Sequence, residues 1–237
     1  HRGMFRPHDA PDLRLLSLRF ETRPEGAIHW IHDVHSNAVT VFEFSTPSDV
    51  LEVKCTFEVI RSAVDQPNFP IAEHAREYPF EYRNDQLPDL TPSMTPHFSD
   101  PNGRVEAFAR IFTAGNKKST WGILEALNAV FKERFTYRRR EEPGIQEPAD
   151  TVSMMSGSCR DYAVLMCEAA RRLGFAARFV TGYLYDPALD ARASETSTTQ
   201  GAGATHAWVQ IFLPGAGWIE FDPTNGGVAS SSLIKTG

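Results

Sequence analysis

Apolar and polar residues alternate with a period of two between residues 13 and 60, the pattern of strands that bury one face. Turn residues interrupt the alternation at Pro24-Glu25-Gly26, Ser36-Asn37 and Pro47-Ser48-Asp49. The predicted strands are Leu13–Glu21, Ala27–Ile31, Ala38–Phe44 and Leu51–Ile60. Because tight turns join strands in antiparallel fashion, this part of the chain predicts an antiparallel β-rich domain.

Prolines recur among mixed polar residues from Pro67 to Pro101. Proline lacks a backbone N–H donor and disfavours helix interiors, so we expect an extended connector without a helix here. The predicted organisation is an N-terminal β-rich domain over residues 1–75, a connector over residues 76–100, and a second domain over residues 101–237.

Beyond the connector the apolar period becomes that of helices. Val105–Phe112 is short and amphipathic. In Trp121–Phe131 the apolar positions recur at spacings of three and four, which predicts a helix with one buried face and places Trp121 in the core.

A third helix is predicted to begin at Cys159. Ser158 followed by Asp161 is a capping-box pattern, which makes Cys159 the first helical residue and Asp161 a helix cap rather than a catalytic acid. Gly174, just past two arginines, matches the end of the helix. The apolar stripe between these ends faces inward, so the thiol lies at the buried N-terminal end.

The C-terminal part of the chain predicts three strands and a loop. A strand over Ala176–Tyr185 precedes residues 187–204, which are rich in Ala, Ser, Thr and Gly and predict a mobile loop. His206–Leu213 alternates strictly, and Trp218–Asp222 follows a Pro-Gly-Ala-Gly turn as the second strand of a hairpin.

The register of this hairpin decides whether His206 and Asp222 can meet. Pairing Leu213 with Trp218 across a four-residue loop would place the two side chains on opposite faces. Pairing odd residues with odd residues matches the apolar faces and puts both on one side. We therefore predict a bulge or an odd-length loop, for which Gly215 and Gly217 are suited.

Cys159, His206 and Asp222 are residue types that carry out nucleophilic catalysis. A thiol attacks a carbonyl as the thiolate, and a free cysteine, with a pKa of about 8.5, is mostly protonated at neutral pH. The positive end of a helix and a nearby imidazolium both favour the thiolate. We expect Cys159 to be the nucleophile, with its backbone N–H as an oxyanion donor, His206 the base and Asp222 the group that orients His206.

Composition excludes several classes of function. The chain has 237 residues, of which 41% are hydrophobic and 23% charged, with a net charge of −6. This balance argues against nucleic acid as a partner, and no apolar run approaches the ~18 residues of a membrane span. The short basic run 138–140 precedes two glutamates, so we expect it to be a solvated turn.

The three cysteines are an odd number without framework spacing, which favours a reducing compartment, so we expect a cytoplasmic location. The chain begins at His1, so an upstream segment can be missing. Cys55 and Cys167 are expected to be small buried hydrophobes. His29, His32 and His35 are expected on the surface rather than in a zinc site, because a spacing of three turns successive strand residues to opposite faces.

Three segments together resemble the transglutaminase-like superfamily, and most of all its bacterial members described as transglutaminase-like cysteine proteases. The segments are 157–163 (GSCRDYA), 172–183 (RLGFAARFVTGY), and 205–209 (THAWV) with 217–225 (GWIEFDPTN). The resemblance implies an α+β protein with a papain-like, transglutaminase-core fold after an N-terminal antiparallel β-sandwich-like domain whose edge strands are truncated here. Gln210 departs from the family pattern, which commonly has an acidic residue there.

The resemblance also implies that Cys159, His206 and Asp222 are the triad. Asp161, Trp208 and Tyr183 are expected to support or line the cleft, and Glu220 to lie at its rim. The implied function is thiol-dependent acyl transfer at peptide or protein amide bonds, with hydrolysis favoured. Two alternatives stay open, a protein-glutamine transglutaminase with an amine acceptor and a catalytically silent peptide-binding or scaffold module. No metal or organic cofactor is implied, and the oligomeric state is undetermined.

Overall fold

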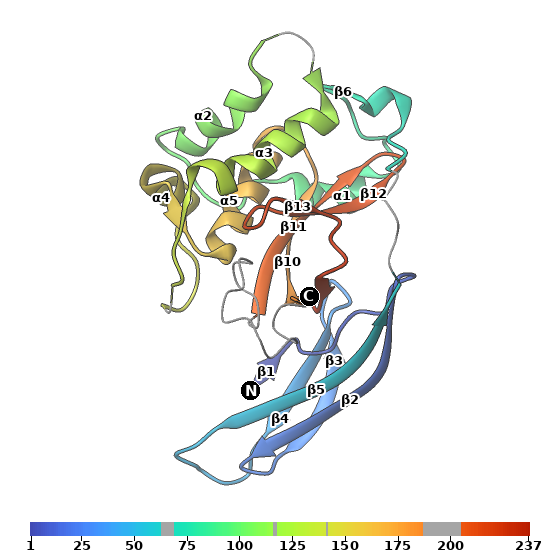
Figure 1. Cartoon of the computed structure of the whole chain (residues 1–237), viewed down its shortest axis with the longest axis vertical. Helices are drawn as coiled ribbons and strands as arrows, with labels where there is room; N and C mark the ends of the chain where they lie inside the picture. Colours follow the sequence, from blue (N-terminus) through green and yellow to red (C-terminus); the bar gives the residue numbers. More distant parts are fainter. Residues whose placement is uncertain (63–68, 116–117, 141, 187–204) are drawn as a thin grey trace.

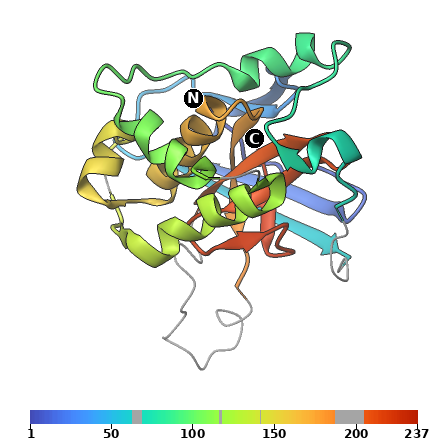
Figure 2. The same cartoon turned by 90° about the horizontal axis from the view of Figure 1, so that it is seen from above.

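The computed structural model describes residues 1–62, 69–115, 118–140, 142–186 and 205–237. A β-sandwich lies at one end of the molecule and a half containing most of the helices lies at the other (Figure 1). In the view from above, the strands of the sandwich lie behind the helical half (Figure 2). Within the described residues, the helices are too short or too polar to cross a bilayer.

The N-terminal half consists of two antiparallel sheets. One pairs β2 (Leu13–Arg23) with β5 (Glu52–Arg61), and the other has the order β1 (Arg2–Gly3), β4 (Ala38–Glu43), β3 (Ala27–His32). Phe20 of β2 packs on Trp30 of β3 and Phe42 of β4, with ring centroids 5.6 and 5.5 Å apart. These aromatic contacts hold the sheets face to face. The four strands predicted by period-two alternation are confirmed.

The segment expected to be an extended connector contains a helix, so that expectation is wrong. It holds the short 3-10 turn η1 (Glu73–Ala75), β6 (Glu77–Tyr78) and helix α1 (Leu87–Met94). Pro88 occupies the first turn of α1, where no N–H bond is lost. Pro92 lies inside the helix, and the Thr91 hydroxyl donates to the Leu87 carbonyl at 2.6 Å. Leu90 is buried, so packing on the half that contains most of the helices stabilises this short helix.

The other helices surround α5 (Cys159–Arg172). They are α2 (Arg104–Arg110), extended by the 3-10 turn η2 (Ile111–Thr113), α3 (Thr120–Arg134) and α4 (Pro148–Met154). Short strands join them: β7 (Lys118–Ser119) pairs with β6, and β8 (Thr136–Tyr137) pairs with β9 (Ser156–Gly157). The predicted helices are confirmed, and Trp121 of α3 is half-buried against the core.

A five-stranded antiparallel sheet packs against α5. Its order is β13 (Gly227–Val228), β12 (Gly217–Asp222), β11 (Thr205–Leu213), β10 (Ala177–Leu184), β14 (Leu233–Lys235). The odd-numbered residues Ala207, Val209 and Ile211 of β11 are at most 1% exposed and share the main core with α5. The predicted loop over residues 187–204 lies outside the described residues.

The register of the β11–β12 hairpin confirms the odd-to-odd pairing. Ile211 lies opposite Ile219, and Leu213 opposite Gly217, which leaves residues 214–216 as the loop. Gly215 and Gly217 have φ of 86° and 78°, in the left-handed region that glycine adopts without strain. His206 and Asp222 therefore fall on the same face of the sheet.

Candidate active site

Cys159 is the first residue of α5, as the capping box predicts. Ser158 is extended at the N-cap, and its N–H donates to Asp161 Oδ2 at 2.8 Å. Cys159 is 8% exposed and lies at the edge of the main core. The thiol is therefore next to the unpaired N–H groups of the helix N-terminus while part of the residue remains open to solvent.

Asp161 anchors a loop to this helix end. Its Oδ1 accepts from the Gln146 N–H at 2.7 Å and from Arg140 Nη1 at 2.8 Å, while Oδ2 accepts from the Ser158 hydroxyl and N–H. Burial raises the pKa of Asp161, but these hydrogen bonds outweigh burial and leave the pKa below its ordinary value. The basic run was expected to be a solvated turn, and this is wrong for Arg140, which pairs with a carboxylate that is 0% exposed.

Replacing Asp161 with alanine is expected to lower the free energy of unfolding by about 2–4 kcal/mol, because several donors lose their acceptor and Arg140 loses its buried partner. Urea denaturation at pH 7 measures this change. The carboxyl has a depressed pKa, so its contribution exists above the unfolded-state pKa and is lost as the pH falls through the folded-state value. The difference between wild type and variant should therefore shrink in acid, and a constant difference would contradict this account.

His206 and Asp222 contact each other directly. His206 Nε2 lies 3.0 Å from Asp222 Oδ2, and the side chains are 0% and 3% exposed. The Thr224 N–H donates to Asp222 Oδ1 at 3.0 Å, and Asn225 Nδ2 donates to Oδ2 at 2.9 Å. Asp222 is thus held in place by the turn after β12, which also completes its hydrogen bonding.

The other ring nitrogen of His206 is not used by Asp222. Nδ1 is buried and has no hydrogen-bond partner within the described part of the chain. Burial by itself lowers the pKa of His206, but the hydrogen bond to Asp222 and the proximity and charges of the Asp222 and Cys159 side chains raise it to about 9. The imidazole therefore stays protonated through neutral pH.

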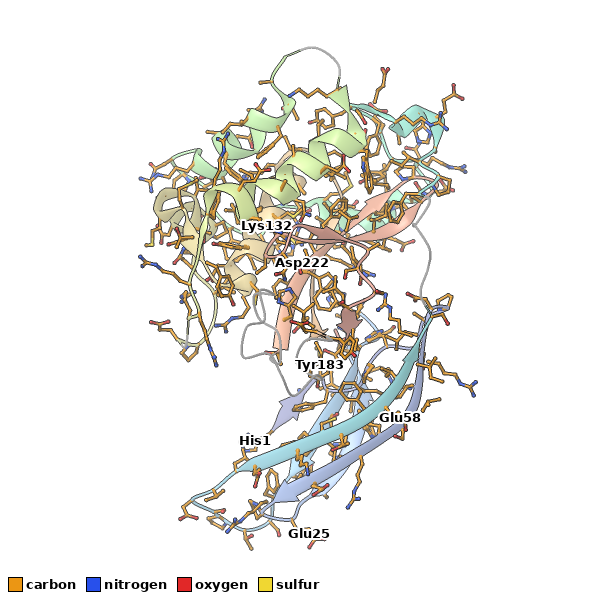
Figure 3. All side chains as sticks on the ribbon, viewed as in Figure 1. His1, Glu25, Glu58, Lys132, Tyr183 and Asp222 are labelled. Carbon is orange, nitrogen blue, oxygen red and sulfur yellow. The ribbon has the colours of Figure 1, made fainter. Side chains whose placement is uncertain are left out.

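Trp208 and Tyr183, expected to support the cleft, occupy different places. Trp208 is 0% exposed, and its ring stacks on that of His206 with centroids 6.1 Å apart. Figure 3 shows Tyr183 at the junction between the five-stranded sheet and the sandwich, whereas Asp222, on the same sheet, lies farther from the sandwich. The Tyr183 hydroxyl donates to the Phe5 carbonyl at 3.3 Å, and its ring lies 5.1 Å from that of Phe57.

Two polar residues at or near the site make contacts that the sequence reasoning did not specify. Gln146 lies in the loop before α4 and binds Asp161, although nothing in its local pattern indicates this. Glu220, expected at the cleft rim, is partly exposed and accepts hydrogen bonds from Trp208 and Gln210. Residues 210 and 220 lie opposite each other in the hairpin register, which could have indicated the contact between Gln210 and Glu220.

The residues expected to play no part in chemistry are placed accordingly in most cases. Cys167 is 2% exposed, and burial raises the pKa of its thiol to about 12. Cys55 is only half-buried in β5, so the expectation that it is buried is wrong. His29, His32 and His35 are exposed. Among the described residues, His, Cys, Asp and Glu form no group of three or more arranged to bind a metal ion.

Two family models match the chain, and together they match most of it. Residues 106–223 match the transglutaminase-like superfamily, and residues 1–60 match the bacterial transglutaminase-like N-terminal region. The first range contains Cys159, His206 and Asp222. The second coincides with the β-sandwich and ends at the last strand of that half.

Similar proteins agree with this assignment. A crystal structure of a candidate cysteine protease from Cytophaga hutchinsonii superposes with a TM-score of 0.71 at 18% identity, covering 99% of this chain and 74% of that one, which establishes the shared fold. An uncharacterized protein of Mycobacterium leprae is 34% identical over 37% of this chain, and YebA of Bacillus subtilis is 26% identical over 66%. This chain spans 29% and 21% of their lengths. The papain-like α+β core and the matching N-terminal region show that the chain belongs to the transglutaminase-like superfamily.

Proposed function

We propose that the protein is a cysteine-dependent acyl-transfer enzyme that acts on amide bonds of peptides or proteins, with water as the usual acceptor. The observation that supports this most is the position of His206. Its Nε2 lies 3.0 Å from Asp222, its Nδ1 has no hydrogen-bond partner among the described residues, and Cys159 at a helix N-terminus is near enough to raise the pKa of the ring. A thiolate, a protonated imidazole and an orienting carboxylate are the groups that nucleophilic catalysis by cysteine requires.

In the first half of the reaction the amide is cleaved. The thiolate sulfur of Cys159 attacks the amide carbon, a C–S bond forms, and the carbonyl electron pair moves onto oxygen. The backbone N–H of Cys159 donates to this oxyanion, a contribution of about 3 kcal/mol per donor in other enzymes. When the C–N bond breaks, His206 gives its proton to the departing amine and becomes neutral.

In the second half the thioester is resolved. Neutral His206 takes a proton from water, the resulting hydroxide attacks the thioester carbon, and the C–S bond breaks. The carboxylic acid leaves and the Cys159 thiolate remains beside a protonated His206. Asp222 accepts the hydrogen bond from Nε2 throughout, so that the imidazole keeps one orientation and its positive charge is stabilised.

Alkylation by iodoacetamide tests the charged pair directly. An ordinary thiol with a pKa of about 8.5 is only about 1% thiolate at pH 6.5. We expect Cys159 in the wild type to react at pH 6.5 about 100-fold faster than Cys159 in the His206→Ala variant, with similar rates at pH 10. Mass mapping of the labelled peptide measures this. Equal rates at pH 6.5 would rule out the proposed enzyme and favour a silent scaffold.

The pH dependence of amide cleavage follows from His206. Because its pKa is raised to about 9, the protonated donor persists below that value and is lost as the pH rises through it. We expect kcat/KM for a chromogenic peptide amide to fall above about pH 9. By the same linkage, His206 stabilises the fold fully below pH 6.5, and this contribution disappears by about pH 9. A basic limb near pH 6.5 would contradict the geometry.

The acceptor is decided at the thioester. Water is abundant, whereas an amine acceptor needs a surface that binds it and keeps water from the thioester. We expect intact-mass measurements of the acyl-enzyme to give free acid as the main product, even with a millimolar primary amine present. A product that is mostly the new amide would instead assign the protein as a transglutaminase.

A further inference from the structure

Beneath the proposed triad, one buried tryptophan supports the catalytic imidazole. Trp208 is 0% exposed, and its ring lies within 25° of parallel to that of His206, with centroids 6.1 Å apart. Both residues are on β11, and their side chains are on the same face of the strand. The indole is therefore a flat surface against which the imidazole rests.

Glycine at position 182 makes room for this surface. Gly182 lies directly opposite His206 in the register of β10 and β11. A Cβ at that position would approach the Trp208 ring to 2.7 Å and would also collide with the Ile234 backbone. The indole can therefore lie across the strand pair only because residue 182 has no side chain.

The orientation of the indole is set by Glu220. Trp208 Nε1 donates to Glu220 Oε1 at 3.1 Å, and Gln210 Nε2 donates to the same oxygen at 3.1 Å. In turn, Gln210 Oε1 accepts from Arg178 Nε at 2.8 Å. Arg178, Gln210 and Glu220 are direct neighbours across three strands. The carboxylate is thus held by a row of side chains.

Charges from outside the hairpin act on this carboxylate. Burial raises the pKa of Glu220 above its ordinary value, and the hydrogen bonds from Trp208 and Gln210 together with the positive charges of Arg61 and Lys235 reduce this rise without cancelling it. Arg61 is the last residue of β5 in the sandwich, and it binds the Leu233 carbonyl and pairs with Asp12 at 2.9 Å. The sandwich therefore supplies one of the charges that act on Glu220.

We propose that Glu220 is a positioning residue: by accepting the indole N–H of Trp208, it holds the ring that keeps the His206 imidazole aligned between Asp222 and Cys159. This inference rests on the proposed function. The stacked indole also favours the charged imidazole, because the face of an aromatic ring attracts a cation. Loss of the acceptor should loosen the indole and reduce the fraction of thiolate at low pH.

Alkylation of Cys159 by iodoacetamide at pH 6.5 and 9.5 tests the role of Glu220. In Glu220→Ala the ratio of the two rates should fall about tenfold against wild type, the size expected when a desolvated cation–π contact is lost. Glu220→Gln retains an acceptor oxygen for the indole and should stay within about twofold. Glu58→Ala, an exposed carboxylate on β5 (Figure 3), is the matched control and should leave the ratio unchanged.

The rate ratio separates positioning from general destabilisation. A merely structural change would lower the stability of the fold without changing how the alkylation rate of Cys159 depends on pH. If Glu220→Ala does not fold, Trp208→Phe decides the question, since it keeps a ring but lacks the N–H. An unchanged ratio in a folded variant would overturn the positioning role. If wild type and His206→Ala already react alike at pH 6.5, the proposed function itself fails, which is a different outcome.

Discussion

Replacing Cys159 with serine is expected to lower kcat/KM for a peptide amide by at least about 10³-fold and to abolish the covalent intermediate. The reason is ionisation. In the proposed mechanism the attacking group is a thiolate, whereas a serine hydroxyl stays protonated at the same position. Steady-state kinetics and intact-mass analysis after rapid quenching measure the two effects.

The control for this experiment is Cys55→Ser in the sandwich, where the half-buried thiol lies far along the chain from the site. That variant should cleave the substrate at the wild-type rate and still form the adduct. If Cys159→Ser keeps more than about a tenth of the activity, or if the adduct maps to another residue, Cys159 is not the nucleophile.

Replacing Asp222 with asparagine is expected to lower kcat by about 10²–10⁴-fold, because the hydrogen bond and negative charge that orient His206 are both lost. Burial by itself lowers the pKa of His206, so without Asp222 the pKa should fall well below 9. The basic limb of the pH profile should then move to lower pH. An NMR titration of the His206 ring measures the same shift independently of activity.

Asp49→Asn, at an exposed turn of the sandwich, is the matched control and should change neither kcat nor the pH profile. A basic limb that stays near pH 9 in Asp222→Asn would show that another group raises the pKa of His206. Loss of activity without any shift of the limb would indicate that Asp222 acts only on the structure of the turn that contains Thr224 and Asn225.

The contacts between the two halves connect the N-terminal sandwich to the sheet that contains His206 and Asp222. Phe5 and Phe57 on the sandwich side contact Tyr183 of the five-stranded sheet. Arg61 of the sandwich binds the carbonyl of Leu233 in the same sheet. Arg61 also acts on Glu220. The sandwich and the half that contains His206 are therefore connected by packing and by charge, and changes at the junction are expected to reach His206 through Trp208.

Local patterns predicted much of the site. Ser158 and Asp161, three residues apart, form a capping box that marks the start of a helix. The period of two on either side of residues 214–216 selects the register of the hairpin. These features depend on backbone conformation and on which face of a strand is apolar, both of which are properties of neighbouring residues. The sequence did not predict helix α1, because the prolines at positions 88 and 92 indicate an extended segment. The helix forms because Leu90 is buried by packing that the local pattern does not reveal.

By itself, the sequence determined the strands of the sandwich, the placement of Cys159 at a helix N-terminus, and the face shared by His206 and Asp222. Only the tertiary structure decided that Arg140 pairs with Asp161, that Tyr183 lies at the junction, and that Glu220 holds Trp208. The physical reason is range. Period and capping act within a few residues of one segment, whereas these partners come from separate segments and meet only when the chain has packed.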